Sequence, residues 1–580
     1  MSGTAPSQKG RAIPPLTRSA FVVPIAVFLG LFAVVMRLWY LQVVRGEELS
    51  RMAVEKRTLR VPIPPPRGKI LDRNGNTIAG LTESLVAMVT PADMEGNDRA
   101  IRRLAELLSL DPSDLKKQIE ENAYRKYLPF VAKVGLTPEE AIRVEEEGAF
   151  LPGVFVRSET LRKYPHANAF AHVLGHVRQP RQEDLERLAD LGDIPTYVGQ
   201  DGLERTYDRL LLGKCGHESV TIDVRMRPTS NPVVEPPTPG EDLRTTLDTR
   251  LQLKAFDLLA GRRGAVVALD PRDGSVLCLV SSPSFNPNVM LGRIPKDVWA
   301  NLNSEARPMF NRAIAGTYNP GSTFKIATLV TAIREGLVSP ATTFVCNGSV
   351  RIGNRTVRCL GHHGRITYQT AIEKSCNVFF AELGSRIERK ELVSVAQEFG
   401  IGVETGIDIP GEAAGLLPTD EWLQSRKENW YTGDTVNLAI GQGRLGVTPL
   451  QMASYVSLIA NRGVAYRPHI AATNKPPERL TAVTLDSTWW DRIVGAMRRV
   501  VESGTGVRAR IEGISIAGKT GSAQTGPGRK PHGWFIAFAP VERPTIALAV
   551  VVENSDEGGR VAAPIAHELL KEYFKGRPSQ

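Results

Sequence analysis

Near the middle of the chain stands the stretch Asn319-Pro-Gly-Ser322-Thr-Phe-Lys325. Its Asn-Pro-Gly start is a turn and helix-start signal, and the helical pattern that follows stops at Gly336. Because a helix places residues three apart on one face, Ser322 and Lys325 are expected to point the same way. A serine hydroxyl is a weak nucleophile that needs a base within reach. A lysine acts as that base when burial or a nearby cation lowers its pKa.

The motif Ser322-Thr-Phe-Lys325 is called the first string. Two further short motifs, the second and third strings, follow in order: Ser375-Cys-Asn377 and Lys519-Thr-Gly521. The second string lies within 371–383, which is predicted to be helical with a loop before it. The third string continues the strand-like run 514–517. Each string alone is common, and is more often an ordinary helix end or a glycine-rich bend. In this order, the three match the penicillin-recognising serine acyltransferases.

The side chains of the two later strings suit the handling of a peptide substrate. Ser375 can relay a proton to a leaving amine, and Asn377 can hydrogen-bond a substrate amide. Lys519 and Thr520 can bind a substrate carboxylate, and Lys519 also supplies a cation near the first lysine. Gly521 lets a substrate backbone approach closely, and the strand edge can pair with an extended peptide. Together the strings predict acyl-enzyme chemistry.

The composition is that of a globular protein with a basic surface. The 580 residues are 42% hydrophobic and 23% charged, which predicts two or three domains with ample core. The net charge of +10 is spread along the chain, without lysine and arginine runs interleaved with aromatic residues. No nucleic acid is therefore expected as a partner. A membrane surface, an anionic polymer or plain solvation accounts for the charge.

An apolar stretch from Ala20 to Met36, closed by Arg37, lies near the N-terminus. Arg37 can snorkel, so a transmembrane helix is predicted over 20–44. A cleaved signal peptide is the weaker alternative, because the apolar part is long and no small-residue cleavage site follows it. Basic residues before the stretch predict a cytoplasmic tail over 1–19. The residues after about 45 are then expected on the other side of the membrane, outside the cytoplasm. A single-pass membrane protein is expected.

The external part divides at a proline-rich stretch, Pro228 to Pro239, which indicates a linker. Before it, a mixed α+β pedestal with this linker is expected over 45–240, without a catalytic constellation of its own. Its amphipathic helices are predicted at 100–108, 112–122 and 138–148. After it, strand-like runs stand at both ends of a helical middle, which predicts one α+β domain over 241–577.

This second domain is predicted to build its sheet from distant segments. A hairpin is expected from 264–270 and 275–281, around Asp273-Gly274. A closing helix is expected over 565–574, with Pro564 in its first turn. The other strand-like runs are 514–517, 534–539 and 545–552.

Further motifs make the chain resemble a class B penicillin-binding protein over nearly its whole length. Arg67-Gly-Lys-Ile-Leu-Asp-Arg-Asn-Gly75 resembles the entry to the family's extracytoplasmic region. Within the class, the chain is closer to penicillin-binding protein 2, the elongation enzyme, than to the division enzyme. The matching segments are 311–313, 318–322, 441–443 and 447–452 for the class, and 172–177, 202–208 and 430–434 for the elongation type.

This resemblance implies a peptidoglycan D,D-transpeptidase on a penicillin-binding, serine β-lactamase-like fold. A stem peptide ending in D-Ala-D-Ala would acylate Ser322, with Lys325 as the base. The backbone N–H groups of Ser322 and Ser522 would form the oxyanion hole. The last D-Ala would leave and an amine of a neighbouring stem would take the acyl group. The site would also act as a serine-type D-Ala-D-Ala carboxypeptidase, bind β-lactams and need no cofactor for catalysis.

The resemblance also implies a place and partners for the enzyme. The stem peptides belong to lipid-linked precursor strands, and the pedestal is expected to dock a RodA-like glycan polymerase and other membrane proteins of the elongation complex. The N-terminus would lie in the cytoplasm, the helix in the cytoplasmic (inner) membrane and the catalytic domain in the periplasm. Cell elongation and cell-shape maintenance would be the process served.

Other functions of the same fold fit less well. A division-type class B transpeptidase is the main alternative. A β-lactam sensor usually carries several spans and a cytoplasmic protease domain, for which a tail of 1–19 leaves no room. A β-lactamase would need neither the anchor nor the pedestal, and no candidate stands out for the deacylating glutamate of class A enzymes. A silent scaffold is disfavoured because all three strings are intact.

The five cysteines are an awkward number for pure disulfide pairing outside the cell. Cys346, Cys359 and Cys376 lie close in sequence, with His362 and His363 between them. Three thiolates and one imidazole make a closed tetrahedral zinc site, and some elongation-type relatives have one near the second string. These three cysteines and His363 are therefore predicted to hold a structural zinc ion. The alternatives are a Cys346–Cys359 disulfide with Cys376 free, or free thiols throughout.

Overall fold

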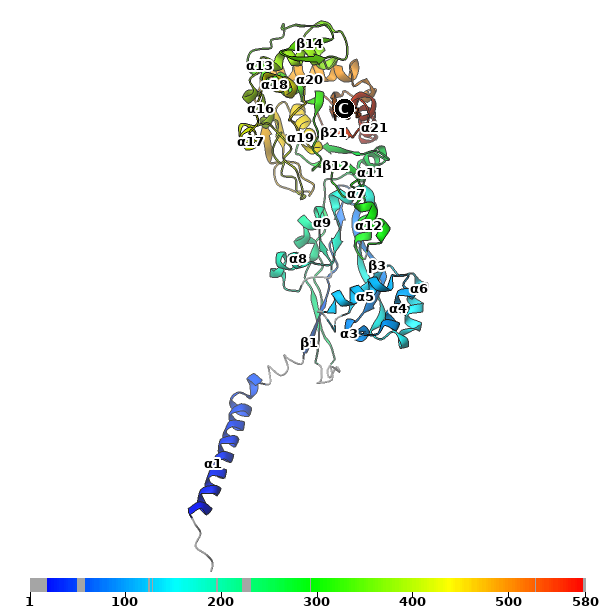
Figure 1. Cartoon of the computed structure of the whole chain (residues 1–580), viewed down its shortest axis with the longest axis vertical. Helices are drawn as coiled ribbons and strands as arrows, with labels where there is room; N and C mark the ends of the chain where they lie inside the picture. The colour runs from blue at the N-terminus through cyan, green and yellow to red at the C-terminus, as the bar shows by residue number, and fades with distance from the viewer. Residues whose placement is uncertain are drawn as a thin grey trace, which may run out of the picture. The chain divides into compact units, whose positions relative to one another are not determined.

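The computed structural model describes residues 18–49, 58–123, 126, 127, 129–193, 197–221, 231–292, 294–526 and 528–576. Most of the predicted cytoplasmic tail, up to residue 17, lies outside these residues. The chain forms two compact units (Figure 1). The first combines Met1–Pro64 with Cys215–Pro237, and the second combines Pro65–Lys214 with Thr238–Gln580. Each unit is thus assembled from two distant parts of the sequence.

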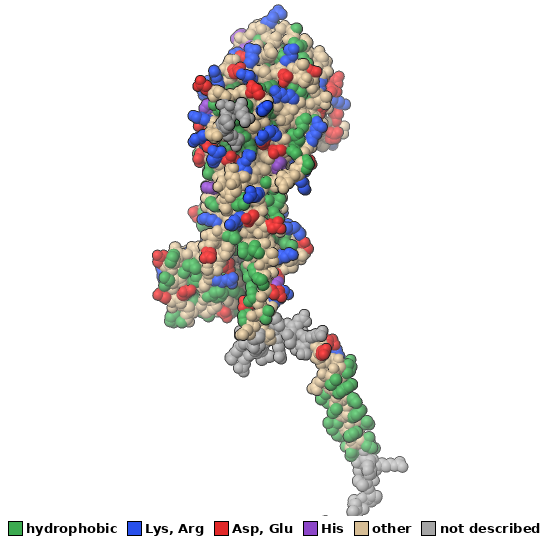
Figure 2. Space-filling model, turned by 180° about the vertical axis from the view of Figure 1, so that it is seen from behind, with side chains coloured by type: hydrophobic (Ala, Val, Ile, Leu, Met, Phe, Trp, Pro, Cys, Tyr) green, Lys and Arg blue, Asp and Glu red, His purple; other side chains and the backbone are tan. Residues whose placement is uncertain are grey.

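The first unit contains the apolar helix. Helix α1 (Arg18–Trp39) continues into a π-helical turn at Tyr40–Val44. Of the described residues, only Val22–Val44 form a helix long and apolar enough to cross a membrane. Hydrophobic side chains cover its surface in Figure 2. A helix that is apolar all round and unburied by protein suits lipid and not water, which is consistent with the predicted single-pass anchor.

A small antiparallel sheet completes the first unit. Strand β1 (Thr58–Ile63) pairs with β8 (Gly216–Thr221), which in turn pairs with β9 (Val233–Glu235). Strand β9 lies inside the proline-rich stretch that the sequence suggests as a linker. Pro232 and Pro236 flank the strand and keep it short, because proline cannot donate a ladder hydrogen bond.

The N-terminal part of the second unit is a sheet with a helical lobe. Its long central strand is β3 (Thr77–Val89), against which the other strands pair. These are β2 (Ile70–Leu71), β4 (Phe130–Val134) and β5 (Val154–Lys163), with β10 (Leu243–Arg244) parallel to β2. The lobe holds α3 (Pro91–Met94), α4 (Asp98–Leu107), α5 (Pro112–Glu121) and α6 (Pro138–Glu146), at the predicted positions for the last three. Their apolar faces form one core with β3.

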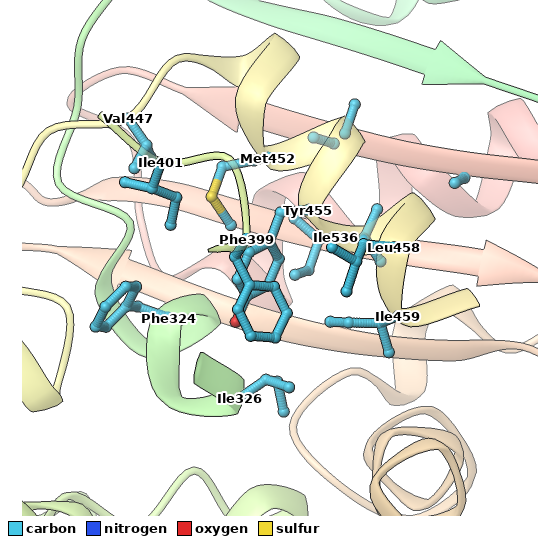
Figure 3. Close-up of a cluster of buried hydrophobic side chains, with 14 of the residues drawn as sticks. Phe324, Ile326, Phe399, Ile401, Val447, Met452, Tyr455, Leu458, Ile459 and Ile536 are labelled. Carbon is cyan, nitrogen blue, oxygen red and sulfur yellow. The ribbon is translucent and has the colours of Figure 1, made fainter. Parts of the chain in front are cut away.

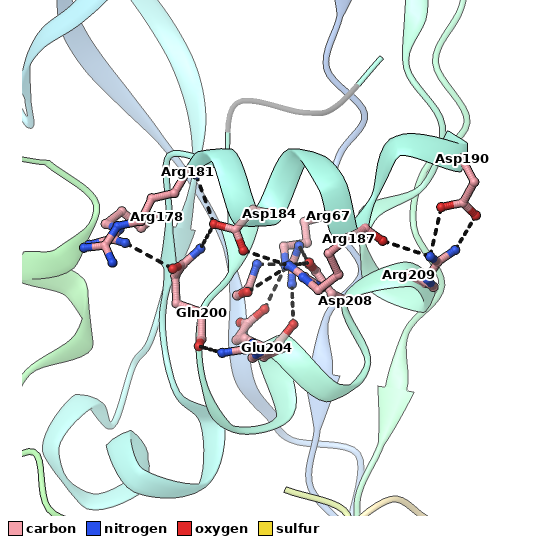
Figure 4. Close-up of polar contacts among 12 residues, drawn as sticks. Arg67, Arg178, Arg181, Asp184, Arg187, Asp190, Gln200, Glu204, Asp208 and Arg209 are labelled. Carbon is pink, nitrogen blue, oxygen red and sulfur yellow. Dashed lines mark hydrogen bonds and ion pairs between the residues drawn. The ribbon is translucent and has the colours of Figure 1, made fainter. Parts of the chain in front are cut away.

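Buried charges tie the segments of this region together (Figure 4). Glu204 in α9 (Gly202–Thr206) is fully buried and accepts from Arg67 Nε at 2.7 Å and Arg162 Nε at 2.6 Å. Asp208, which begins α10 (Asp208–Leu212), pairs with Arg67 Nη1 at 2.9 Å. Buried ions are tolerated only when paired, so this network fixes the entry segment, β5 and α9 relative to one another.

The C-terminal part of the second unit carries the central sheet. Its strand order is β12-β11-β21-β20-β19, with neighbours antiparallel. The bounds are β11 (Gly264–Leu269), β12 (Val276–Ser282), β19 (Ala517–Ala523), β20 (His532–Ala539) and β21 (Ile546–Val552). Strand β11 pairs with its hairpin partner on one side and with a strand from the far C-terminus on the other. The predicted α+β class and the sheet built from distant segments are confirmed.

Helices cover both faces of this sheet. On one face, α11 (Thr249–Leu258) and α21 (Gly558–Phe574) share a core with the strands. The other face packs on α13 (Lys325–Arg334), α19 (Pro449–Ala460) and α20 (Ser487–Glu502). Every residue of α19 is buried, including the polar Gln451, Ser454 and Ser457. In Figure 3, Phe324, which comes directly before α13, and Ile326 in its first turn lie in one core with Phe399 and Tyr455, so this core supports the first string directly.

The remaining elements lie around these two sheets. In the N-terminal part they are α7 (Ala167–Leu174), α8 (Gln182–Arg187), β6 (Val177–Arg178) and β7 (Val198–Gly199). In the C-terminal part the helices are α12 (Lys296–Leu302), α14 (Tyr368–Glu373), α15 (Asn377–Gly384), α16 (Arg389–Glu398), α17 (Asp420–Arg426) and α18 (Thr432–Ala439). The short strands are β13 (Phe344–Cys346), β14 (Ser349–Ile352), β15 (Arg355–Arg358), β16 (Gly364–Ile366), β17 (Val464–Tyr466) and β18 (Arg479–Ala482).

Two predicted boundaries are wrong. Helix α21 begins at Gly558, so Pro564 lies inside the helix and not in its first turn. The helix starts early because Gly558 packs against the sheet, where an added Cβ would lie 2.0 Å from the Trp534 carbonyl oxygen. Strand β19 begins only at Ala517, since a turn closed between Ile511 and Ile514 precedes it. The third string therefore lies within the strand.

Candidate active site

The first string folds as a tight turn that enters a helix. Gly321–Phe324 is a 3-10 turn, and α13 begins at Lys325. Residues i and i+3 of a 3-10 turn eclipse, so Ser322 and Lys325 are on the same side. Gly321 has a φ of +55°, and a Cβ built there would lie 2.6 Å from the Ser522 carbonyl oxygen. Only glycine fits this position.

Lys325 is fully buried at the centre of the site. Its Nζ donates to the Ser375 carbonyl oxygen at 2.8 Å and to Asn377 Oδ1 at 2.7 Å. Burial lowers the pKa of Lys325 to about 8, although the nearby thiols of Cys376 and Cys359 raise it. An amine with such a pKa is partly neutral at neutral pH and can accept a proton.

The second string lies at a break between two helices. Helix α14 ends at Glu373 and α15 begins at Asn377, so the continuous helix predicted over 371–383 is wrong. Hydrogen bonds from Ser375 N to Ile372 O and from Cys376 N to Ala371 O close α14 instead. Ser375 adopts a left-handed backbone with a φ of +56°, which is uncommon for a residue with a side chain. The break turns a carbonyl and an amide oxygen toward the same lysine.

The third string brings a second buried lysine to the site. Lys519 Nζ donates to Ser375 Oγ at 2.9 Å and to the Thr520 carbonyl oxygen at 3.0 Å. Burial, assisted by the charge of Lys325, holds the pKa of Lys519 well below its ordinary value. Two lysines thus converge on Ser375, one at its carbonyl oxygen and the other at its hydroxyl.

Strand β19 packs directly on the turn that carries Ser322. A Cβ at Gly521 would lie 2.7 Å from the Pro320 carbonyl oxygen, so a side chain there would push the strand away. Ser522 is half-buried, and its carbonyl oxygen accepts from Gln442 Nε2 at 3.1 Å. Strand β19 is the last in the sheet order and pairs with β20. The structure therefore brings the three strings into contact.

Several long-range contacts that support the site are not predicted by the sequence. Tyr318 OH donates to Glu553 Oε1 at 2.8 Å, and Arg312 Nε donates to the same oxygen at 2.9 Å. Trp534 Nε1 donates to the Asn319 carbonyl oxygen at 3.0 Å. These contacts fix the turn before Ser322. Tyr318 and Glu553 are 235 residues apart, so no local sequence pattern predicts that they are in contact. Thr505 also reaches the site, and only a Gly-Thr-Gly bend marks it in the sequence.

The predicted metal ligands form a compact quartet beside the second string. The ligand atoms of Cys346, Cys359, His363 and Cys376 all lie within 4.8 Å of one another. Cys359 Sγ is 3.7 Å from Cys376 Sγ and 3.6 Å from His363 Nδ1, and Cys346 Sγ is 3.5 Å from the same nitrogen. A tetrahedral zinc ion with its usual bond lengths separates two sulfurs by about 3.8 Å, and a sulfur from a nitrogen by about 3.5 Å. The donor set and spacing fit zinc.

The quartet is directly connected to the active site. The backbone N–H of Asn377 donates to Cys359 Sγ at 3.3 Å, while the side chain of Asn377 accepts from Lys325. A hydrogen bond from Cys376 lowers the pKa of the Cys359 thiol well below its ordinary value, which favours a ligating thiolate. No disulfide joins the cysteines in the described part of the chain. His362 is exposed, so His363 supplies the imidazole of the quartet.

Two family models match the chain. The penicillin-binding protein transpeptidase domain matches residues 264–571, and the penicillin-binding protein dimerisation domain matches residues 62–245. The peptidoglycan D,D-transpeptidase MrdA of Acinetobacter baumannii is 34% identical over 94% of this chain and 85% of its own length. The chain belongs to the class B penicillin-binding proteins of the MrdA type.

Other MrdA-type proteins and structures agree with this assignment. MrdA of Escherichia coli K12 is 31% identical over 96% of this chain and 94% of its own length. The complex between penicillin-binding protein 2 and MreC from Helicobacter pylori contains a chain with a TM-score of 0.79 and 27% identity, matching 90% of this chain and 99% of that one. Penicillin-binding protein 2 of Pseudomonas aeruginosa in complex with WCK 5153 has a TM-score of 0.69 and 30% identity, matching 90% and 98%.

The predicted family, fold and enzyme class are thereby confirmed. As an MrdA-type class B penicillin-binding protein, the chain is an elongation-type peptidoglycan D,D-transpeptidase that binds penicillin and serves cell shape. The transpeptidase family needs no cofactor for its chemistry. A cluster of three cysteines and one histidine that could hold a metal ion is an addition to that chemistry.

Proposed function

We propose that the three strings form one acylation site, in which Ser322 is the nucleophile and Lys325 its base. The observation that carries this proposal is the convergence of two fully buried lysines on Ser375, beside the turn that presents Ser322. Neutral Lys325 takes the hydroxyl proton as Ser322 Oγ attacks the carbonyl carbon of the penultimate D-alanine of a stem peptide. The backbone N–H groups of Ser322 and Ser522 stabilise the oxyanion that forms.

The second half of acylation breaks the bond to the last D-alanine. The proton held by Lys325 returns to the leaving amine through the hydroxyl of Ser375, which Lys519 holds at 2.9 Å. An amine of a neighbouring stem then attacks the acyl-enzyme, its proton returns to Ser322 Oγ, and a cross-link results. When water replaces the amine, the same steps give carboxypeptidase activity.

Substrate binding is assigned to strand β19 and to Asn377. An extended stem peptide pairs with the edge of β19, the last strand in the sheet order. Thr520 and Lys519 take the terminal carboxylate. The side-chain amide of Asn377 uses one hydrogen on the Arg358 carbonyl oxygen, at 3.0 Å, and keeps the other for a substrate amide.

We also propose that Cys346, Cys359, His363 and Cys376 hold a structural zinc ion. The support is the match between the spacing of their ligand atoms and a tetrahedral site. Zinc would tie the loop that carries Cys359 to Cys376, the N-cap residue of α15. It takes no part in the acyl transfer. Metal analysis that finds no zinc, together with a Cys346–Cys359 cross-linked peptide, would favour the disulfide alternative.

The finer assignments of place and partner are proposals as well. Among the similar solved structures, one is a complex with MreC, and another concerns structural coordination of polymerization and crosslinking by a peptidoglycan synthase complex. By analogy, a pedestal over 45–240 docks a RodA-like polymerase and other elongation proteins, and a domain over 241–577 performs the chemistry on lipid-linked strands. The tail over 1–19 is cytoplasmic, the helix over 20–44 crosses the inner membrane, and the rest is periplasmic.

Labelling with a fluorescent penicillin tests the nucleophile. Membranes that contain the wild-type chain should show a labelled band, and Ser322→Ala should abolish it because the ester to Oγ cannot form. Ser425→Ala is a matched control, since Ser425 is an exposed serine of α17 outside the three strings. Equal labelling of wild type and Ser322→Ala would overturn the assignment.

A further inference from the structure

A short segment after α20 lies between the second and third strings. Its Thr505 Oγ1 is 2.6 Å from Thr520 Oγ1, the hydroxyl of the third string. The backbone N–H of Thr505 donates to the carbonyl oxygen of Glu373 at 3.3 Å, two residues before Ser375. Thr505 therefore connects Thr520 of the third string to the end of α14, just before the second string.

The segment is rigidly held at both ends. The carboxylate of Glu373 is buried and accepts from Ser503 Oγ at 3.1 Å, and it pairs with Arg499 at 2.9 Å. A Cβ at Gly504 would lie 2.6 Å from the Glu373 carbonyl oxygen, so the segment lies directly on the end of α14. On the other side, a Cβ at Gly559 would lie 2.5 Å from the Thr505 carbonyl oxygen. Thr505 is thus fixed before any substrate arrives.

The hydroxyl pair has a defined supply of hydrogens. Each threonine hydroxyl has one hydrogen to donate and two lone pairs. The contact between Thr505 and Thr520 uses one of the two hydrogens and leaves the other for a ligand. A substrate carboxylate has only acceptors, so it binds best where the free hydrogen is already directed at it. With Thr505 as donor, the free hydrogen is the one on Thr520.

We infer that Thr505 is a positioning residue for recognition of the substrate's terminal carboxylate: it donates to Thr520 and so orients the Thr520 hydroxyl hydrogen toward that carboxylate. The inference rests on the proposed role of Thr520 in carboxylate binding. It makes the requirement for a free carboxylate in the ligand depend on a residue outside the three strings. The acylation rate with a ligand that lacks the carboxylate should not depend on Thr505.

The test compares two ligands on the full-length protein in detergent. The second-order rate constant of acylation is measured for benzylpenicillin and for its methyl ester, which lacks the negative charge. For Thr505→Val, the rate with the acid should fall about 5- to 30-fold, and the rate with the ester by less than about twofold. Thr505→Ser keeps the hydroxyl and should restore the acid rate to within about threefold of wild type.

The ratio of acid to ester rates makes the outcome independent of how much protein is folded. Thr481→Val is the matched control, because Thr481 Oγ1 also makes a 2.6 Å hydrogen bond, to the Glu398 carbonyl oxygen, outside the three strings. Its acid-to-ester ratio should equal that of wild type. An unchanged ratio in Thr505→Val would overturn the inference, since a packing role would slow both ligands equally.

Thr520→Val separates this inference from the function on which it rests. Loss of the acid-to-ester ratio in Thr520→Val but not in Thr505→Val would overturn only the role of Thr505. An unchanged ratio in Thr520→Val would overturn both the carboxylate role of Thr520 and the inference. When both variants lose the ratio, the double variant should lose no more than either single one, because the two hydroxyls act as a unit.

Discussion

Acylation of Ser322 should become faster as the pH rises through about 8. Burial lowers the pKa of Lys325 from 10.5 to about 8, so in the folded protein this lysine loses its proton at a lower pH than an exposed lysine does. Only the neutral amine can accept the serine proton, so the rate follows the deprotonated fraction. That fraction is about one tenth at pH 7 and about nine tenths at pH 9, a rise of roughly tenfold followed by a plateau.

Stopped-flow acylation by a fluorescent penicillin between pH 6.5 and 9.5 measures this profile. An exposed lysine would instead give a rise of about a hundredfold from pH 7 to 9, without a plateau. The variant Asn377→Asp provides an internal comparison, because it places a carboxylate where Asn377 Oδ1 now lies, 2.7 Å from Lys325 Nζ. An opposite charge at that distance favours the ammonium, so the midpoint should move to higher pH.

Two results would refute this reasoning. A rate that is flat from pH 6.5 to 9.5 would mean that deprotonation of Lys325 does not limit acylation. A midpoint that stays in place in Asn377→Asp would mean that the titrating group is not Lys325. Circular dichroism at each pH is the control for loss of fold.

Three further predictions concern stability and geometry. Glu204→Gln should lower the free energy of unfolding by about 3–5 kcal/mol in a denaturant titration, because buried Arg162 loses its counter-charge and buried Arg67 keeps only Asp208; a loss below about 1 kcal/mol would contradict this. Gly321→Ala should slow penicillin acylation at least about fivefold, whereas Gly336→Ala, with nothing within 4 Å of the added Cβ, should leave it near wild type; equal rates would contradict the close approach to β19. Cys359→Ser should lower the zinc content and the melting temperature together, and an unchanged zinc content on atomic emission would speak against the site.

Local patterns predicted the elements that depend on short-range rules. The helices of the lobe appear where amphipathic spacing and prolines predict them, and Asp111 caps α5 with hydrogen bonds to the first turn. The same rules failed at Ser375. Its left-handed backbone depends on the contacts that the surrounding helices and Lys325 make, and a sequence window does not contain these contacts. Helix α21 began early for a similar reason, since its first residues pack against the sheet.

The sequence predicts the pairing of serine and lysine in the site because Ser322 and Lys325 are three residues apart. Local helical geometry alone places them on one side. The sequence does not predict the reactivity of these two residues. Lys325 becomes a base only because the folded core excludes water from it, and burial is a property of the whole domain. Likewise, Lys519 meets Ser375 across 144 residues of sequence, because β19, the last strand in the sheet order, packs on the turn of the first string. Short sequence segments thus determine which groups are available to react. Tertiary packing determines which of these groups meet and what their pKa values are.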